Sequence, residues 1–140
     1  MRIHSKEDFL SVFDKIVSHF DNMSWFFKKK KKESEYLNDL HKEYIKLSYQ
    51  RPQVLFKHSH KCGTSTWVLR EFNEMLEGVD CSFDFVLINV FDKRPLSNEL
   101  SRVLDIPHQS PQVLVLKNGK VTDHASHGHI LQLNITHLLC

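Results

Sequence analysis

The sequence predicts an α/β domain in which helices cover both faces of a small mixed sheet. Short apolar segments typical of buried strands alternate with segments of helical periodicity. The last two strand segments are joined by Asn118-Gly119, the strongest short signal for a hairpin. Because alternating strands and helices favour parallel pairing and a hairpin is antiparallel, we expect a sheet that is parallel in its first half and antiparallel in its second.

The composition fits one compact domain. The chain has 140 residues, 41% of them hydrophobic, with only four glycines and four prolines. Its formal net charge is +2, which the five lysines at 28–32 exceed by themselves, so we expect no nucleic-acid-binding face. No apolar segment approaches the roughly 20 residues of a membrane span, and no signal-peptide core follows Met1. We therefore expect a cytoplasmic protein.

Residues 1–34 are interpreted as an N-terminal segment outside the domain, which takes up residues 35–140. Helical spacing at 5–20, with Ser5 and Asp8 in capping-box positions, predicts an amphipathic helix. This helix would pack on the domain, bind a partner or touch a membrane surface. The apolar and then basic stretch that follows is interpreted as a linker, or as a segment that touches an anionic membrane surface weakly.

The first half of the domain places a cysteine where a strand becomes a helix. Helical spacing predicts a helix over 35–48, and Pro52 precedes an apolar run at 53–57 that predicts a buried strand. A second helix follows Cys62 and ends at Gly78, a residue type common just after helices. Residues 83–90 are almost continuously apolar, as expected for a strand covered on both faces.

The second half contains one helix before the hairpin and one after it. Pro95 opens a helix that runs to Leu104, since proline is well tolerated in the first turn. Residues 112–116 and 120–123 are the two hairpin strands, and helical spacing predicts a last helix over 130–139.

The chain has three cysteines, which is an odd number and too few for the disulfide framework of a small secreted protein. We therefore expect all of them to be free thiols. Cys81 is interpreted as a small buried hydrophobe, and Cys140 as a thiol at a mobile end, either without a role or able to resolve a mixed disulfide on Cys62. Trp67 and the phenylalanines are expected in the core.

Cys62 is the candidate nucleophile. A thiolate attacks disulfides, and the free N–H groups and partial positive charge of a helix N-terminus favour an anion. Lys61 adjoins it and His58 and His60 lie close in sequence, so further cationic help is expected. Ser65 cannot form a disulfide, but its hydroxyl could donate a hydrogen bond to the Cys62 sulfur.

Four segments of the chain resemble one known family. They lie at 56–62, 89–100, 110–113 and 117–120, and the most telling motifs are Arg94-Pro95-Leu96-Ser97-Asn98 and Ala125-Ser126-His127. Over roughly residues 35–127 the chain resembles the monothiol bacilliredoxins of the thioredoxin-like superfamily. The resemblance implies a central mixed four-stranded sheet flanked by helices, here with an extra N-terminal amphipathic helix. It also implies a thiol-disulfide oxidoreductase that removes bacillithiol from protein mixed disulfides.

The resemblance also implies the roles of single residues. Cys62 corresponds to the nucleophile, Ser65 to the residue that replaces a second cysteine, and Pro111 to a cis-proline facing the nucleophile. Substrate-binding positions are the following: Lys61, Gly63, Thr64, Ser110 and Pro111. The family commonly has Thr-Cys-Pro-Ile-Ser at the cysteine turn and a tryptophan at the position of Gly128, and these departures bear on the choice of small thiol.

Two other kinds of function stay open, metal binding and redox sensing without catalysis. A cluster of His58, His60, Cys62, His124, His127 and His129 suggests a metal site, although the spacing matches no closed site. The Cys-Gly-Thr-Ser turn is also close to that of monothiol glutaredoxins, which implies an iron–sulfur cluster shared between two chains. The redox-sensing alternative is a non-catalytic module whose Cys62 is capped by a small thiol under oxidative stress. Our preferred interpretation has no metal and no cofactor; its partners are a low-molecular-weight thiol as co-substrate and S-thiolated client proteins, and the chain is a monomer.

Overall fold

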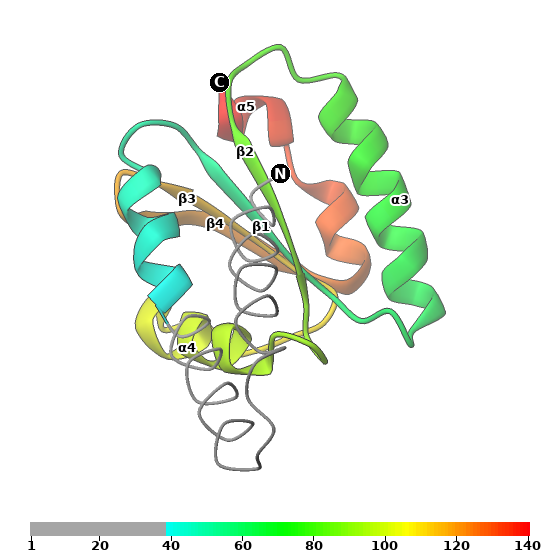
Figure 1. Cartoon of the computed structure of the whole chain (residues 1–140). Coiled ribbons are helices and arrows are strands. Elements are labelled where there is room, and N and C mark those ends of the chain that lie inside the picture. The colour runs from blue at the N-terminus through cyan, green and yellow to red at the C-terminus, as the bar shows by residue number, and fades with distance from the viewer. Residues whose placement is uncertain (1–38) are drawn as a thin grey trace, which may run out of the picture.

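A four-stranded mixed sheet organises the computed structural model, which describes residues 39–140 (Figure 1). Strand β1 (Gln53–His58) pairs in parallel with β2 (Asp84–Asn89) and antiparallel with β3 (Gln112–Lys117). Strand β4 (Lys120–Ser126) pairs antiparallel with β3, so the strand order is β2-β1-β3-β4. The predicted division into a parallel half and an antiparallel half is confirmed.

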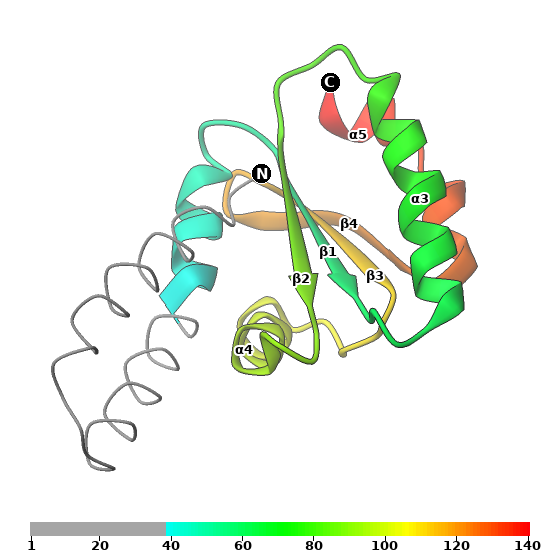
Figure 2. The same cartoon turned by 45° about the vertical axis from the view of Figure 1, so that its right-hand side comes forward.

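Helices cover both faces of this sheet (Figure 2). Helix α3 (Gly63–Glu77), the 3-10 helix η1 (His127–Gln132) and α5 (Ile135–Leu139) lie on one face. The helix over 39–47 and α4 (Arg94–Leu104) lie on the other face. Each face has its own apolar core, and β1 contributes to both.

The central strand β1 is buried along its whole length. Val54 and Phe56 point to the α3 face, whereas Leu55 points to the α4 face, as the two-residue repeat of a strand requires. The repeat continues at the carboxyl end, where Lys57 bonds to α4 residues and His58 to an α3 residue. Two titratable side chains, Lys57 and His58, are therefore buried at the carboxyl end of the central strand β1.

The hairpin between β3 and β4 forms at the predicted Asn118-Gly119. Both residues have positive φ values, 51° and 79°, which glycine and asparagine tolerate best. A Cβ atom at Gly119 would meet the ring of the exposed Tyr49, which would have to move to admit a side chain. The Gly119 N–H donates to Ser48 Oγ at 2.9 Å.

Two sequence interpretations of the helices are corrected. The single helix expected over 130–139 is split into η1 and α5, because the Asn134 side chain caps α5 by accepting from the His137 N–H. Trp67 was expected in the core but is 48% exposed, since α3 buries the face that carries Val68 and Phe72. Phe91, also expected in the core, is 45% exposed in the turn after β2.

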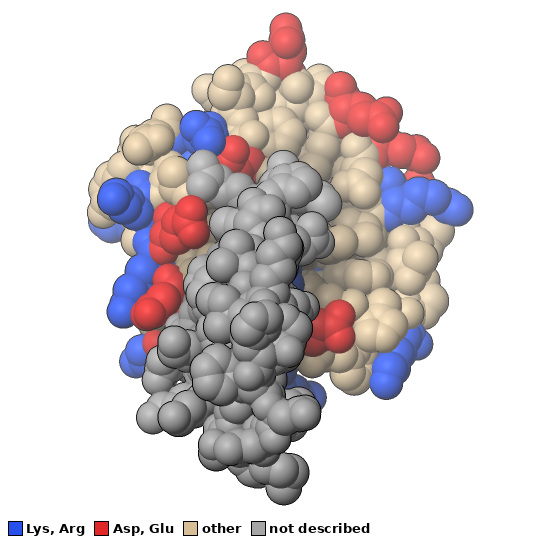
Figure 3. All heavy atoms as spheres, in the orientation of Figure 1, with Lys and Arg blue, Asp and Glu red and all other residues tan. Residues whose placement is uncertain are grey.

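Several expectations lie outside the described residues: the helix at 5–20, the segment at 23–32 and the start of the helix at 35–48. Within residues 39–140, no helix is long and apolar enough to cross a membrane. On the face seen in Figure 3, acidic and basic side chains are interspersed among the described residues. The cytoplasmic location stays a prediction.

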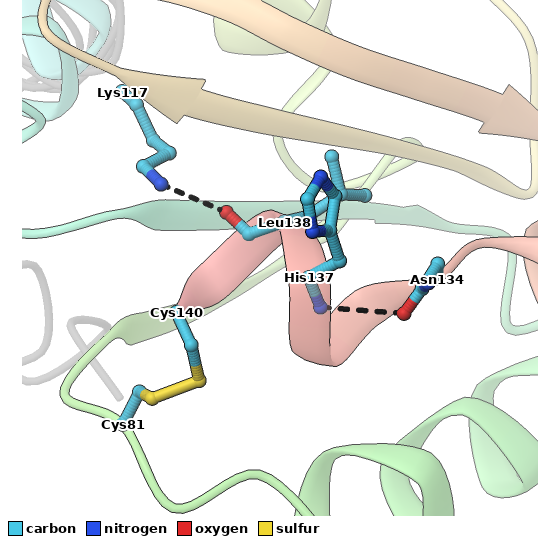
Figure 4. The surroundings of a disulfide bond; sticks show 6 residues. All are labelled: Cys81, Lys117, Asn134, His137, Leu138 and Cys140. Atoms are coloured by element: carbon cyan, nitrogen blue, oxygen red, sulfur yellow. Dashed lines mark hydrogen bonds between the residues drawn. A yellow bond between two sulfur atoms is a disulfide. The ribbon is translucent and has the colours of Figure 1, made fainter.

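The expectation of three free thiols is wrong, because Cys81 and Cys140 form a disulfide (Figure 4). Cys81 lies between α3 and β2, and Cys140 follows α5 on the same side of the sheet. Their Cα atoms are 5.7 Å apart although 59 positions separate them in sequence. Lys117 Nζ also donates to the Leu138 carbonyl at 3.1 Å, so α5 is tied to both β3 and the start of β2. Cys140 therefore has neither of the roles that the sequence suggested.

Breaking this disulfide is expected to lower the free energy of unfolding. It closes a loop over a sequence separation of 59 residues, and loops of that size contribute about 2–4 kcal/mol by restricting the unfolded chain. Urea unfolding of the wild-type chain with and without a strong reductant measures the difference. The Cys140→Ser variant is the control, because reductant should leave its midpoint unchanged. An equal midpoint for oxidised and reduced wild-type protein would contradict the assignment.

Candidate functional site

Cys62 occupies the N-cap position of α3, a helix of 15 residues. Its backbone is extended, with φ −112° and ψ 118°, and its carbonyl accepts from the Thr66 N–H at 3.1 Å. No side chain caps this end of the helix. The first N–H groups of a helix have no partner within it, so the amide end next to the sulfur stays available to an anion.

The space in front of this helix end is open. Cys62 is a free cysteine of intermediate exposure, and the next two residues, Gly63 and Thr64, are exposed. A Cβ atom built on Gly63 would have no neighbour within 4 Å. A disulfide can therefore approach the sulfur and the two predicted substrate-binding residues from solvent.

Ser65 lies behind the cysteine and is completely buried. Its Oγ accepts from the Ser59 N–H at 3.1 Å and is 2.8 Å from His58 Nδ1. The proposed hydrogen bond from Ser65 to the Cys62 sulfur is not formed, because the hydroxyl points inward to the end of β1. Ser65 thus fixes the turn that carries Cys62, and it leaves the sulfur free.

His58 does not supply the cationic help that its position in the sequence suggested. Burial, and secondarily the charge of His60, lowers the pKa of His58, so the neutral imidazole is favoured. In that form Nδ1 and the Ser65 hydroxyl form one hydrogen bond between uncharged groups. The His58–Ser65 pair is therefore a neutral, buried hydrogen bond that holds β1 to α3.

His60 and Lys61 turn toward the end of β2 instead of toward the helix. The Asn89 side-chain amide donates to His60 Nδ1 at 2.7 Å, and the His60 ring meets the edge of Phe91 with centroids 5.4 Å apart. Lys61 Nζ lies 4.7 Å from the centroid of Phe91. These contacts place a positive charge over an aromatic ring one residue before Cys62.

The strand register brings the Ser110–Pro111 turn to the same edge of the sheet. Lys57 pairs with Gln112, so Pro111 lies beside the end of β1 that leads to Cys62. The Ser110–Pro111 peptide bond is cis, and the Pro111 carbonyl accepts from the His127 N–H at 3.0 Å. Among the described residues, the Ser110 hydroxyl is one of few buried polar atoms with no hydrogen-bond partner.

The sequence matches the family described as monothiol bacilliredoxin BrxC over residues 17–135. The chain belongs to the monothiol bacilliredoxin family. Membership in this family supports a thiol oxidoreductase as the general class of this protein. It agrees with a site that has one free cysteine and a serine three residues later.

Solved structures show the same fold for this bacilliredoxin. A candidate oxidoreductase with a thioredoxin fold has 23% identity and a TM-score of 0.60, and the match covers 69% of this chain and 86% of that one. Thioredoxin from Fasciola hepatica has 18% identity and a TM-score of 0.53, covering 70% and 88%. Thioredoxin f from spinach chloroplast has 17% identity and a TM-score of 0.55, covering 71% and 79%. The predicted thioredoxin-like fold is confirmed.

The histidines that suggested a metal site are not brought together. In residues 39–140, no group of three His, Cys, Asp or Glu side chains is placed to hold a metal ion. His127 is bonded to Gln109 at 3.1 Å, and His129 is bonded to Gln132 at 3.3 Å. No residues of the bacilliredoxin described here are therefore assigned to a metal.

Sequence reasoning missed Lys57, which is completely buried on the α4 side of the same edge. Its ammonium donates to the Ser97 carbonyl and to Ser101 Oγ, both at 2.9 Å, and lies 3.4 Å from His108 Nδ1. All three partners are uncharged or neutral groups, and burial lowers the pKa of Lys57 from 10.5 to about 8. A lysine inside an otherwise apolar strand was the signal that could have identified it.

The buried lysine predicts a rise in stability at alkaline pH. The pKa of Lys57 is about 8 in the folded chain and 10.5 when unperturbed, so between these values the unfolded chain binds more protons. The free energy of unfolding should therefore increase through this range, and Lys57→Met should abolish that part of the increase. Urea unfolding at several pH values measures it, with Lys46→Met as an exposed control. A difference between wild type and Lys57→Met that does not change with pH would contradict the prediction.

Proposed function

We propose that this chain removes a low-molecular-weight thiol, of the bacillithiol kind, from mixed disulfides on client proteins. The observation that carries the proposal is the free Cys62 sulfur at an uncapped, solvent-open helix N-terminus, with Ser65 and not a second cysteine three residues later. Family membership supports the same chemistry.

In the first step, the Cys62 thiolate attacks the small-thiol sulfur of the mixed disulfide. A sulfur–sulfur bond forms between Cys62 and the small thiol, and the bond from the small thiol to the client breaks. The client leaves as a thiolate and takes a proton from solvent. One disulfide replaces another, so no external oxidant is needed.

The second step needs a thiol from outside this chain. Ser65 is an alcohol and cannot form a disulfide, and Cys140 is already bonded to Cys81. Cys81 precedes β2, whereas Cys62 follows the parallel strand β1, so the length of a six-residue strand, roughly 20 Å, separates the two ends. A second small thiol would therefore attack the mixed disulfide on Cys62 and leave as the oxidised dimer.

The turn at Ser110–Pro111 supports a substrate position beside the sulfur. The register places this turn beside the end of β1 that leads to Cys62. Its backbone groups would pair with an extended substrate that carries the mixed disulfide. Gly63 and Thr64 leave room on the helix side of the same space.

Substituting Cys62→Ser is expected to reduce turnover to the uncatalysed rate. The serine oxygen cannot accept the small thiol in a disulfide, so no client thiol is released. The assay incubates a client peptide carrying a mixed disulfide with catalytic amounts of protein and an excess of small thiol. Mass spectrometry then follows the reduced peptide over time.

The double variant Cys81→Ser/Cys140→Ser is the matched control, because it removes the other two sulfurs and should keep turnover. Activity that persists in Cys62→Ser would refute the assignment of the nucleophile. If Cys62 takes up one equivalent of the small thiol and excess small thiol does not remove it, the protein is a sensing module and not an enzyme.

A further inference from the structure

A small pocket lies beside the thiol site, on the α4 side of the sheet edge. Its volume is about 130 Å³, and it is lined by Val90, Phe91, Arg94, Ser97, Asn98 and His108. Three of these residues belong to the motif Arg94-Pro95-Leu96-Ser97-Asn98 that the sequence analysis singled out and the proposed function does not use. The motif therefore lines a pocket next to the site, and the exchange reaction at Cys62 gives it no role.

Two positive charges flank this pocket. The ammonium of the fully buried Lys57 bonds to the Ser97 carbonyl and to His108, which both line it. Arg94 is exposed at the pocket. Within residues 39–140, neither Lys57 nor Arg94 forms an ion pair with a carboxylate, and no lining residue is acidic. A buried cation without a counter-charge favours an anion nearby.

His108 is in contact with Lys57 and lines the same pocket as Arg94. Burial lowers the pKa of His108, and the charges of Lys57 and Arg94 lower it further. Neutral His108 accepts at Nδ1 from Lys57 and lies 3.2 Å from the Ser97 hydroxyl. The ring therefore presents no charge of its own, and the positive potential of the pocket comes from Lys57 and Arg94.

The ring of Phe91 connects the pocket to the cysteine turn. Phe91 lines the pocket and is also in contact with His60 and with Lys61, the residue before Cys62. A ligand whose sulfur is at Cys62 and whose chain passes the exposed Phe91 would reach Arg94 at its far end. The pocket volume suits one small group such as a carboxylate, and not a folded client surface.

We propose that this pocket, formed by Arg94, Asn98 and His108 next to the buried Lys57, binds a carboxylate of the low-molecular-weight thiol. The inference rests on the proposed function, because it names the class of small thiol that the site accepts: one with an anionic group several bonds from its sulfur. The carboxylate accepts from the Arg94 guanidinium and the Asn98 amide, while Lys57, behind the lining residues Ser97 and His108, adds positive charge. The motif around Arg94 is thus a specificity site for the co-substrate.

The test uses two matched small thiols, N-acetyl-Cys-Asp-amide and N-acetyl-Cys-Asn-amide, each linked by a disulfide to the same neutral client peptide. The two differ in one carboxylate only. Wild-type protein should take up the Asp thiol on Cys62 about tenfold faster, the value of one charge-assisted hydrogen bond. Arg94→Gln should bring the ratio close to one, and Lys57→Met should lower it without abolishing it, whereas Arg102→Gln on the same helix should preserve it.

A binding measurement separates this inference from the proposed function. The Asp probe with its sulfur methylated cannot exchange, yet it should shift the His108 ring resonances of the wild-type protein and not those of Arg94→Gln. Equal uptake of both thiols by wild type, or a ratio unchanged in Arg94→Gln, would overturn the pocket assignment while exchange at Cys62 stands. Binding of the methylated probe without any uptake on Cys62 would support the pocket and refute the exchange reaction.

A further control places the Asp or Asn residue in the client peptide and leaves the small thiol neutral. It shows whether the carboxylate that matters belongs to the small thiol or to the client. A preference that appears only when the aspartate is in the client peptide would also overturn the assignment, because the pocket would then recognise the protein and not the small thiol.

Discussion

The buried hydroxyl of Ser65 holds together the turn on which the site is built. It accepts from the Ser59 N–H and bonds to His58, so the first turn of α3 is tied to the last residues of β1. The five residues between Ser59 and Ser65, His60 to Thr64, therefore form a turn beyond the carboxyl end of β1. Cys62 therefore reaches the amide end of the helix with its sulfur uncapped and accessible, and the chemistry that we propose follows from that placement.

The sequence was sufficient for the layout of the domain. Asn118-Gly119 specified the hairpin through its positive φ values, and the apolar run around Phe56 specified a buried strand. The position of Cys62 between that strand and α3 followed from local pattern alone. These features depend on neighbours in the chain, which is the information that periodicity contains.

Features that depend on distant residues were not predictable in the same way. Cys81 and Cys140 become neighbours only after α5 folds back onto the start of β2, and an odd number of cysteines gave no reason to pair them. The inward direction of the Ser65 hydroxyl and the loss of charge at His58 arise from burial, which local sequence does not report. Lys57 was overlooked because its partners come from α4 and the loop after it. The disulfide and the contacts of Ser65, His58 and Lys57 therefore required the structure.

Thiol exchange at this site depends on Cys62 being the one cysteine that reacts in the native protein. Brief treatment of the native chain with a thiol-alkylating reagent, without reductant, followed by mass-spectrometric mapping, tests this most directly. We predict label on the peptide that contains Cys62, and an unlabelled, disulfide-linked pair of peptides that contains Cys81 and Cys140. A protected Cys62, or label on either of the other two cysteines, would contradict the account.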